Sequence, residues 1–350
     1  MAELVWKHKS RLAPHSLSSP NGSASTPPSP VNLVTRQCHL PQTSTTPPSA
    51  ENWQNRLILG DSCEILPSLS STLGNIVKLI YIDPPFMTGR TFKKGLQVVY
   101  KDAWRDLDHY LQWLYETLMS LYALLAEDGS LYIHLDWRVA HYAKVILDEI
   151  FGFNPLIHGP GFKNEIVWHY QSGGRATRTY ARKHDTILFY TKSAHYSFHS
   201  ERIGERRGAH KRNHMRKEVG ADGSVSWTIR SAGRIYTYHE DRLMSPADVW
   251  SDISHLHQRD PERTAYATQK PEVLLERILL ASSDEHDLVL DCFCGSGVTP
   301  AVAERLGRRW IACDKSELAI DITQKRLLAQ NHTTPFVVQA ATAQQSLRDA

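Results

Sequence analysis

The sequence predicts an α/β fold in which one central sheet is assembled from two distant segments of the chain. Two short strings, each directly after an apolar strand-like run, carry this prediction. Asp-Pro-Pro-Phe at 83–86 follows the run 79–82, and a glycine-rich turn at 293–297 follows the run 288–291. Ligands of open α/β sheets bind at the carboxyl ends of strands, and glycine-rich turns there receive nucleotide-like molecules. Because this nucleotide-binding half comes last, we expect a circularly permuted sheet.

Strands and helices alternate from residue 53 onward, as in other α/β domains. The clearest helix is predicted over 106–126, where leucines recur at helical spacing. The other elements expected in this half are strands near 56–61, 78–83, 131–135, 164–170 and 186–191, and helices near 64–69 and 138–151. After residue 263 we expect a helix from Pro271, further helices at 298–306 and 316–329, and strands at 288–291 and 310–314.

Composition divides the chain into five segments. Residues 1–52 are rich in Ser, Thr and Pro and cannot bury enough apolar surface to fold, so we expect disorder there. Their scarcity of acidic residues also occurs in organelle transit peptides, which is a minor alternative. Residues 195–262 are polar and basic and interrupt the alternation, which indicates an insertion. We therefore expect a catalytic half at 53–194, a cofactor-binding half at 263–332 and a tail at 333–350.

The composition also limits the class of protein. The chain has 350 residues, of which 41% are hydrophobic and 22% charged, as in soluble globular proteins. No apolar run has the length of a membrane span, so no membrane partner is expected. The five cysteines lack the paired spacing of a zinc site, the histidines form no metal-ligand pattern, and no metal is expected. Because the net charge is only +3, any surface for nucleic acid must be local.

The turn at 291–297 has the features of a nucleotide site. Gly295 and Gly297 let the backbone approach a ligand closely and direct free N–H groups toward it. Asp314 ends the next predicted strand, about twenty residues later, where a carboxylate can bond ribose hydroxyls. This spacing also suits nicotinamide or flavin cofactors. The third glycine of a pyrophosphate site is missing, and Pro300 lies early in the next helix, which favours a cofactor without pyrophosphate, such as S-adenosylmethionine.

The string Asp83-Pro84-Pro85-Phe86 suits an exocyclic amino group on a flat ring. The lone pair of that nitrogen is delocalised into the ring, which makes it a poor nucleophile. If the Asp83 side chain and the Pro84 carbonyl accept its protons, the nitrogen becomes tetrahedral and its lone pair points at a methyl donor. The prolines fix the backbone, and Phe86 offers a stacking face. The string therefore predicts methylation of a nucleobase amine.

A base inside a duplex cannot reach such a pocket and must be extruded. The basic insertion is the candidate for holding double-stranded DNA, although a charged run can also be a solvated face. The predicted contacts are Arg206, Arg207, Lys211 and Arg212 to phosphates and Arg230 and Arg234 to base edges.

At this point the chain resembles the permuted, beta-class amino DNA methyltransferases, which modify adenine N6 or cytosine N4. The resemblance runs from Asn55 to Leu328 and leaves out the insertion. Matching strings lie at 55–61, 83–86, 129–136, 164–168, 184–190, 248–250, 268–271 and 293–297, followed by Asp314. The resemblance implies a Rossmann-like fold that depends on S-adenosylmethionine, with the insertion as its target-recognition region.

The resemblance also implies roles for individual residues. Asp83, Pro84, Pro85 and Phe86 would form the catalytic string. Around the cofactor, Phe293, Gly295 and Gly297 would line the methionine part in the turn that starts at Asp291, Asp314 would hold the ribose, Asp61 would lie near the adenine, and Lys270 would lie by the carboxylate. Phe86 stands where Tyr is commoner, which removes a hydroxyl but keeps the stacking face.

Asp83 makes the chain more similar to the adenine-N6 enzymes than to the cytosine-N4 enzymes, which usually have Ser there. We therefore expect adenine-N6 methylation of duplex DNA, with cytosine N4 as the alternative. A catalytically silent DNA-binding protein on the same scaffold is a further alternative, against which the intact Asp83 argues. RNA or protein-glutamine methylation is disfavoured because those enzymes usually carry Asn at this position. A homodimer, a cognate restriction endonuclease and a cytoplasmic, nucleoid-associated location are also expected.

Overall fold

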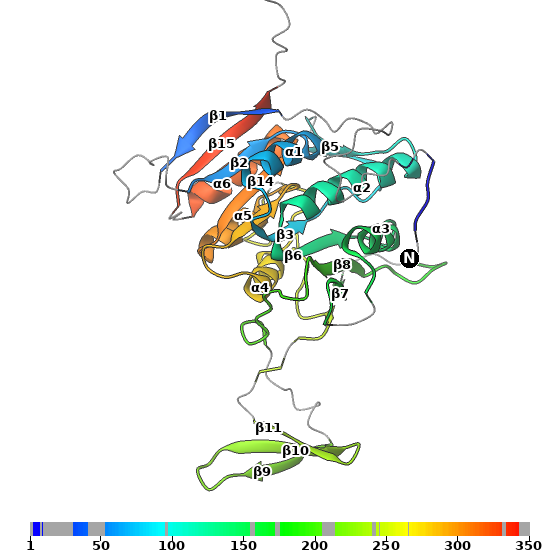
Figure 1. Cartoon of the computed structure of the whole chain (residues 1–350), viewed down its shortest axis with the longest axis vertical. Coiled ribbons are helices and arrows are strands. Elements are labelled where there is room, and N and C mark those ends of the chain that lie inside the picture. Colours follow the sequence, from blue (N-terminus) through cyan, green and yellow to red (C-terminus); the bar gives the residue numbers. More distant parts are fainter. Residues whose placement is uncertain are drawn as a thin grey trace, which may run out of the picture.

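The computed structural model describes residues 3–7, 9, 31–40, 53–94, 97–154, 158–171, 176–204, 214–239, 243–244, 246–264, 266–330 and 334–342. A ten-stranded sheet forms its centre, in the order β1-β15-β2-β14-β13-β3-β6-β8-β7-β12 (Figure 1). These strands are β1 (Asn32–His39), β15 (Phe336–Thr342), β2 (Asn55–Leu59), β14 (Arg309–Asp314), β13 (Leu288–Asp291), β3 (Val77–Ile82), β6 (Leu125–Leu135), β8 (His184–Thr191), β7 (Gly161–His169) and β12 (Val249–Trp250).

Helices cover both faces of this sheet, which gives the three-layer arrangement expected of an α/β domain (Figure 1). The first face carries α1 (Ser62–Leu73), α2 (Leu107–Leu124) and α3 (Ala140–Phe151). The second carries α4 (Glu272–Ser282), α5 (Val298–Arg305) and α6 (Glu317–Ala329). Within the described part of the chain, no helix is both long and apolar enough to cross a bilayer.

The sheet is permuted, as the order of the two strings predicts. Strand β13, from the last quarter of the chain, lies parallel to β3 and pairs Val289 with Leu79 and Leu290 with Ile80. The half expected to bind the cofactor is therefore inserted between strands of the first half. This pairing brings the carboxyl ends of β3 and β13 side by side.

The structure at both ends of the chain differs from the prediction of a disordered segment at 1–52 and a tail at 333–350. Strand β1 lies within the segment 1–52 and pairs antiparallel with β15, which lies within the predicted tail 333–350. Trp6 is also buried, and its indole donates to Gln112 at 3.0 Å. The composition was misleading here because pairing with a preformed sheet satisfies the backbone of a polar segment, whatever its side chains. The rest of both segments lies outside the described residues.

The insertion is also narrower than 195–262. Its projecting part is a separate antiparallel sheet of β9 (Arg216–Val219), β10 (Val225–Ser231) and β11 (Arg234–His239), drawn apart from the main body in Figure 1. Its beginning packs on α4, where His199 N donates to Ala281 O at 2.7 Å. Its end supplies β12, which pairs with β7. Short apolar stretches in a polar context concealed these contacts from the sequence.

At the amino ends of β2 and β14, a buried polar network joins the two halves of the domain. The Asn55 amide accepts from Trp310 N at 2.9 Å and donates to Glu304 Oε2 at 2.9 Å. The Trp310 indole donates to the same carboxylate oxygen at 2.8 Å. Asn55 begins β2, whereas both partners lie in the last quarter of the chain, so this network fixes the permuted arrangement.

We predict that Asn55→Ala destabilises the protein by about 2–4 kcal/mol, because it leaves Trp310 N without its acceptor and removes one of the donors to the buried Glu304 carboxylate. Urea unfolding of the variant measures this change. The matched control is Asn164→Ala, an exposed position on β7, which should change stability by less than about 0.5 kcal/mol. Equal effects of the two substitutions would contradict the structural role of Asn55.

Candidate active site

A cavity of about 710 Å³ lies at the carboxyl ends of the parallel strands. The two strings singled out in the sequence both line it, one after β3 and the other after β13. Their side chains and those around them include Asp83, Phe86, Asp136, Asp291, Phe293 and Asp314. The expectation that distant strings face one site is therefore confirmed.

Asp83 has one carboxylate oxygen that is paired and one that has no partner among the described residues. Its Oδ2 lies 2.5 Å from Nζ of Lys270. Its Oδ1 is buried and has no hydrogen-bond partner among the described residues. The Pro85 carbonyl accepts from the Tyr110 hydroxyl at 2.9 Å, whereas no described donor bonds to the Pro84 carbonyl. One carboxylate oxygen and one carbonyl are thus left as acceptors at the start of the string.

The loop that carries Phe86 is held by a carboxylate that sequence reasoning missed. Asp102 is only 1% exposed and accepts from three successive backbone N–H groups, those of Phe86, Met87 and Thr88, at 3.2, 2.9 and 2.8 Å. The Thr88 hydroxyl adds a bond of 2.6 Å, and the Trp104 indole one of 3.3 Å. Successive N–H groups around an anion form a nest, which is a rigid arrangement. Asp102 therefore fixes the position of Phe86.

A second buried network lies beside Phe86. The His134 ring is stacked on the Phe86 ring, with centroids 6.3 Å apart and planes 19° apart. His134 bonds to the Tyr81 hydroxyl at 3.0 Å and to Asp185 at 3.1 Å, and the Tyr170 hydroxyl donates to Asp185 at 3.0 Å. Burial acts to raise the pKa of Asp185, but the hydrogen bonds from His134 and Tyr170 and the electrostatic effect of His134 and Lys270 outweigh it and lower the pKa. Asp185 is therefore an ionised group at neutral pH.

The glycine-rich turn has the geometry that only glycine accepts. Gly295 and Gly297 have φ of 51° and 73°, in the left-handed region. A Cβ on Gly295 would lie 2.9 Å from the Tyr266 ring, and one on Gly297 would lie 2.6 Å from Thr323. The Asp314 carboxylate accepts from Gly295 N at 3.0 Å and thereby ties this turn to the end of β14.

Buried carboxylates surround the same turn. Asp291 accepts from the Thr299 hydroxyl at 2.6 Å and from Phe293 N at 3.0 Å. Burial raises the pKa of Asp291 to about 7, and the negative charges of Asp83 and Asp314 contribute. Asp61 caps α1 by accepting from Cys63 N at 3.0 Å and lines the same cavity. A backbone cradle flanked by carboxylates fits a ligand with ribose hydroxyls and an ammonium group.

Lys270 differs in its contacts from the role that the resemblance implies. The prediction places it by the carboxylate of the cofactor, whereas its ammonium group contacts Asp83 and lies 5.4 Å from the centroid of the Phe86 ring. Lys270 therefore lies beside the acceptor string, in the cavity that the glycine-rich turn also lines.

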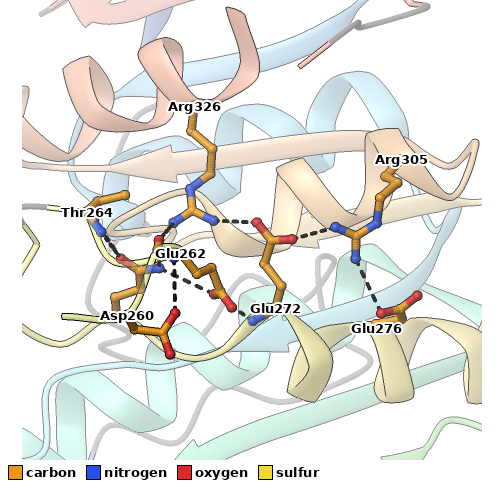
Figure 2. Close-up of polar contacts among 8 residues, drawn as sticks. Asp260, Glu262, Thr264, Glu272, Glu276, Arg305 and Arg326 are labelled. Carbon is orange, nitrogen blue, oxygen red and sulfur yellow. Dashed lines mark hydrogen bonds and ion pairs between the residues drawn. The ribbon is translucent and has the colours of Figure 1, made fainter. Parts of the chain in front are cut away.

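A network of ion pairs and hydrogen bonds joins the segment before Lys270 to α4 and α6 (Figure 2). Glu262 caps α4 by accepting from Glu272 N at 2.8 Å, and Arg326 bonds to the Glu272 carboxylate at 2.7 Å. Gln269 accepts from Thr264 N at 2.6 Å. The sequence assigned no role to Glu262 or Arg326, whose contacts join the segment before Lys270 to α4 and α6. Together they fix the course of the chain that delivers Lys270 to Asp83.

Two of the residues predicted to bind DNA, Arg230 and Arg234, do not line this cavity. Arg230 and Arg234 are exposed on the projecting sheet of β9, β10 and β11. Arg206, Arg207, Lys211 and Arg212 lie outside the described residues.

Comparison with known proteins agrees with this geometry. The sequence model of a DNA methylase family matches residues 77–325. The type II methyltransferase M.HpaI of Haemophilus parainfluenzae is 31% identical over 274 residues, which cover 78% of this chain and 74% of M.HpaI. The DNA adenine methyltransferase YhdJ of Escherichia coli K12 is 28% identical over 83% of this chain and 88% of YhdJ.

The fold has relatives among solved structures. The structure of TTHA0409 from Thermus thermophilus, described as a DNA modification methylase and complexed with S-adenosyl-L-methionine, superimposes with a TM-score of 0.53. It is 18% identical in sequence, and the match covers 83% of this chain and 99% of TTHA0409. The family that the motifs resemble is thus confirmed: the chain belongs to the N6-adenine and N4-cytosine DNA methyltransferases.

Proposed function

We propose that this chain transfers a methyl group from S-adenosylmethionine to N6 of an adenine extruded from duplex DNA. The observation that carries the proposal is that Asp83, which has one oxygen without a described partner, lines the same cavity as the glycine-rich turn. Transfer needs the amino group and the methyl group in one place, because positioning supplies much of the rate of such a reaction.

The residues around the turn suit the cofactor. S-adenosylmethionine supplies an electrophilic methyl group on a positively charged sulfur. The turn at 293–297 would hold its methionine part, and Asp314 has lone pairs left for ribose hydroxyls beyond the two that bind backbone N–H groups. Asp61 and Asp291 add negative charge toward a cationic ligand. S-adenosyl-L-methionine bound to TTHA0409 supports this assignment.

The acceptor side would prepare the base nitrogen for attack. Asp83 Oδ1 and the Pro84 carbonyl would accept its two N–H protons, which localises the lone pair on nitrogen. Lys270 holds the other oxygen, so the carboxylate keeps its direction without reorganising in the transition state. The nitrogen would then attack the methyl carbon as its bond to the sulfonium sulfur breaks, which leaves a neutral thioether, and the methylated amine would lose one proton to Asp83 or to water.

Two observations favour adenine over cytosine. The first is Asp83 itself, where the cytosine-N4 enzymes usually carry Ser. The second is the similarity to YhdJ, which is named an adenine methyltransferase and matches along most of both chains. Cytosine N4 stays the alternative. The intact acceptor string disfavours a catalytically silent DNA-binding protein.

The partners are proposals of the same kind. Double-stranded DNA would be gripped by Arg230 and Arg234 on the projecting sheet together with the basic residues before it. The type II relatives suggest a restriction endonuclease of matching specificity, and a homodimer and a nucleoid-associated location in the cytoplasm complete the proposal.

The experiment that tests the proposal is methylation of unmodified bacteriophage DNA with labelled S-adenosylmethionine, followed by mass spectrometry of the nucleosides. We expect N6-methyldeoxyadenosine, and at least a roughly 100-fold lower rate for Asp83→Ala, as for other losses of a positioned polar group. N4-methyldeoxycytidine would replace the adenine assignment. Equal background labelling by wild type and variant would favour the silent DNA-binding protein.

We predict that Phe86→Ala lowers kcat by about 10- to 100-fold, because stacking of a base on an aromatic ring contributes ~1–3 kcal/mol. The dissociation constant of S-adenosylmethionine, measured by calorimetry, should change by less than about twofold. Phe86→Tyr keeps the stacking face and should retain activity. An unchanged kcat for Phe86→Ala would remove the stacking role.

We predict that Asp102→Asn lowers kcat by about tenfold or more, because an amide has one acceptor oxygen where the loop needs two. The affinity for S-adenosylmethionine should stay within about twofold. The matched control is Asp106→Asn, the cap of α2, where Asn serves as well as Asp. If both substitutions left kcat unchanged, Asp102 would not be a positioning residue.

A further inference from the structure

A basic rim lies beside the base-binding side of the cavity, apart from the projecting sheet of β9, β10 and β11. We define it as Trp137, Arg138, Arg182, Lys183, His255, His257 and Arg263. These residues come from the turn after β6, from the segment before β8 and from the segment after β12. Three chain segments far apart in sequence thus bring cationic groups to one edge of the sheet.

The first part of the rim is an indole with two guanidinium groups near its ring. Trp137 is 45% exposed, an unusual exposure for so large an apolar side chain. The guanidinium carbon of Arg182 lies 4.0 Å from the centroid of its ring, and that of Arg138 lies 4.8 Å away. Arg138 forms an ion pair with Asp136, whereas no carboxylate of the described residues pairs with Arg182. Arg182 is therefore a cation available to an anionic partner.

The second part of the rim lies next to Tyr170. The rings of His255 and His257 are 4.7 Å apart, and the His255 ring is 5.7 Å from Tyr170. Burial lowers the pKa of His255, and the neighbouring groups His257, Arg263 and Lys183 lower it further. His255 and Arg263 also line the cavity.

The interior and the rim have opposite charge. Asp83, Asp136 and Asp185 line the base-binding side, so a phosphate group would be repelled from the interior. An extruded nucleotide can place its base there only if its phosphates stay at the mouth, where the rim lies. The charge pattern therefore fits a nucleic-acid strand that sends one base inward.

We propose that the basic rim binds the strand from which the base is extruded, with Arg182 and Arg138 on phosphates beside the target and Trp137 stacked on a neighbouring base. The inference rests on the proposed function. It assigns strand contacts to the catalytic body and leaves the projecting sheet to the reading of sequence. Phosphate contacts of this kind position a duplex without reading it.

The test is the binding of a fluorescent DNA duplex by anisotropy over a series of salt concentrations, in parallel with methylation of bacteriophage DNA. Arg182→Ala should raise the duplex dissociation constant by about tenfold and reduce the salt slope by about one, as for the loss of one phosphate contact. Trp137→Ala should raise the same constant with less change in slope. In methylation, both variants should raise KM for DNA and leave kcat at saturating DNA within about twofold.

The matched control is Arg309→Ala, because Arg309 is an exposed arginine 5.6 Å from the ring of Trp53 at the opposite, amino end of the strands. It should leave duplex binding unchanged. Arg182→Lys should restore the salt slope, since it keeps the charge but not the planar stack.

The outcomes separate the two proposals. Loss of duplex binding in Arg182→Ala supports the rim even if wild type transfers no methyl group, a result that would remove only the proposed function. Normal methylation by wild type, with unchanged binding and KM in Arg182→Ala and Trp137→Ala, overturns the rim. An RNA duplex that competed better than the DNA duplex would overturn the choice of DNA as the partner.

Discussion

The parallel pairing of β3 with β13 is the contact on which the site depends. Only two residue pairs register these strands, Val289 with Leu79 and Leu290 with Ile80. That short ladder places the acceptor string and the glycine-rich turn at adjacent strand ends. If the register of β13 against β3 shifted by one residue, each side chain of β13 would point to the opposite face of the sheet. Asp291 would then no longer line the cavity. The buried Asn55 network, which ties β2 to the last quarter of the chain, makes such a slip costly.

The cavity gathers carboxylates that would repel one another if all were charged and unpaired, and each is accommodated differently. Asp83 is paired with an ammonium group, Asp102 with three backbone N–H groups, and Asp185 with ring and hydroxyl donors. Asp314 accepts from the N–H groups of Gly295 and Ser316, whereas Asp291, deeply buried on the donor side, has a pKa of about 7 and is partly protonated at neutral pH. The site is thus preorganised before any ligand binds, as electrostatic catalysis requires.

Much of this site could be predicted from the sequence, because its two strings directly follow strands. What could not be predicted depends on partners that are distant in sequence. Asp102 lies in an unremarkable polar stretch, and its role becomes visible only when the hairpin of β4 (Arg90–Lys94) and β5 (Gln97–Asp102) folds back on the string. Strand β1 was missed for a similar reason, since it is held by its pairing with β15 rather than by its own composition. Strand β15, by contrast, buries apolar side chains and also pairs with β2, so its own sequence carried a signal that was missed. Net charge was equally uninformative about the rim, whose cations are scattered among three segments.

The sequence predicts that one insertion both holds the DNA and reads its sequence. In the proposed arrangement, these two tasks belong to different parts of the molecule. Strand contacts at the rim are built on β6, β8 and the residues after β12, which are part of the rigid body that holds Asp83. A nucleotide bound at the rim is therefore held at a fixed position relative to the Asp83 oxygen, whatever the DNA sequence around it. The projecting sheet of β9, β10 and β11 has no such constraint, because it forms its own ladder and, among the described residues, none with the main sheet. Its residues can change with the target sequence while the geometry of methyl transfer stays the same, which is how a common catalytic body can serve different recognition sites.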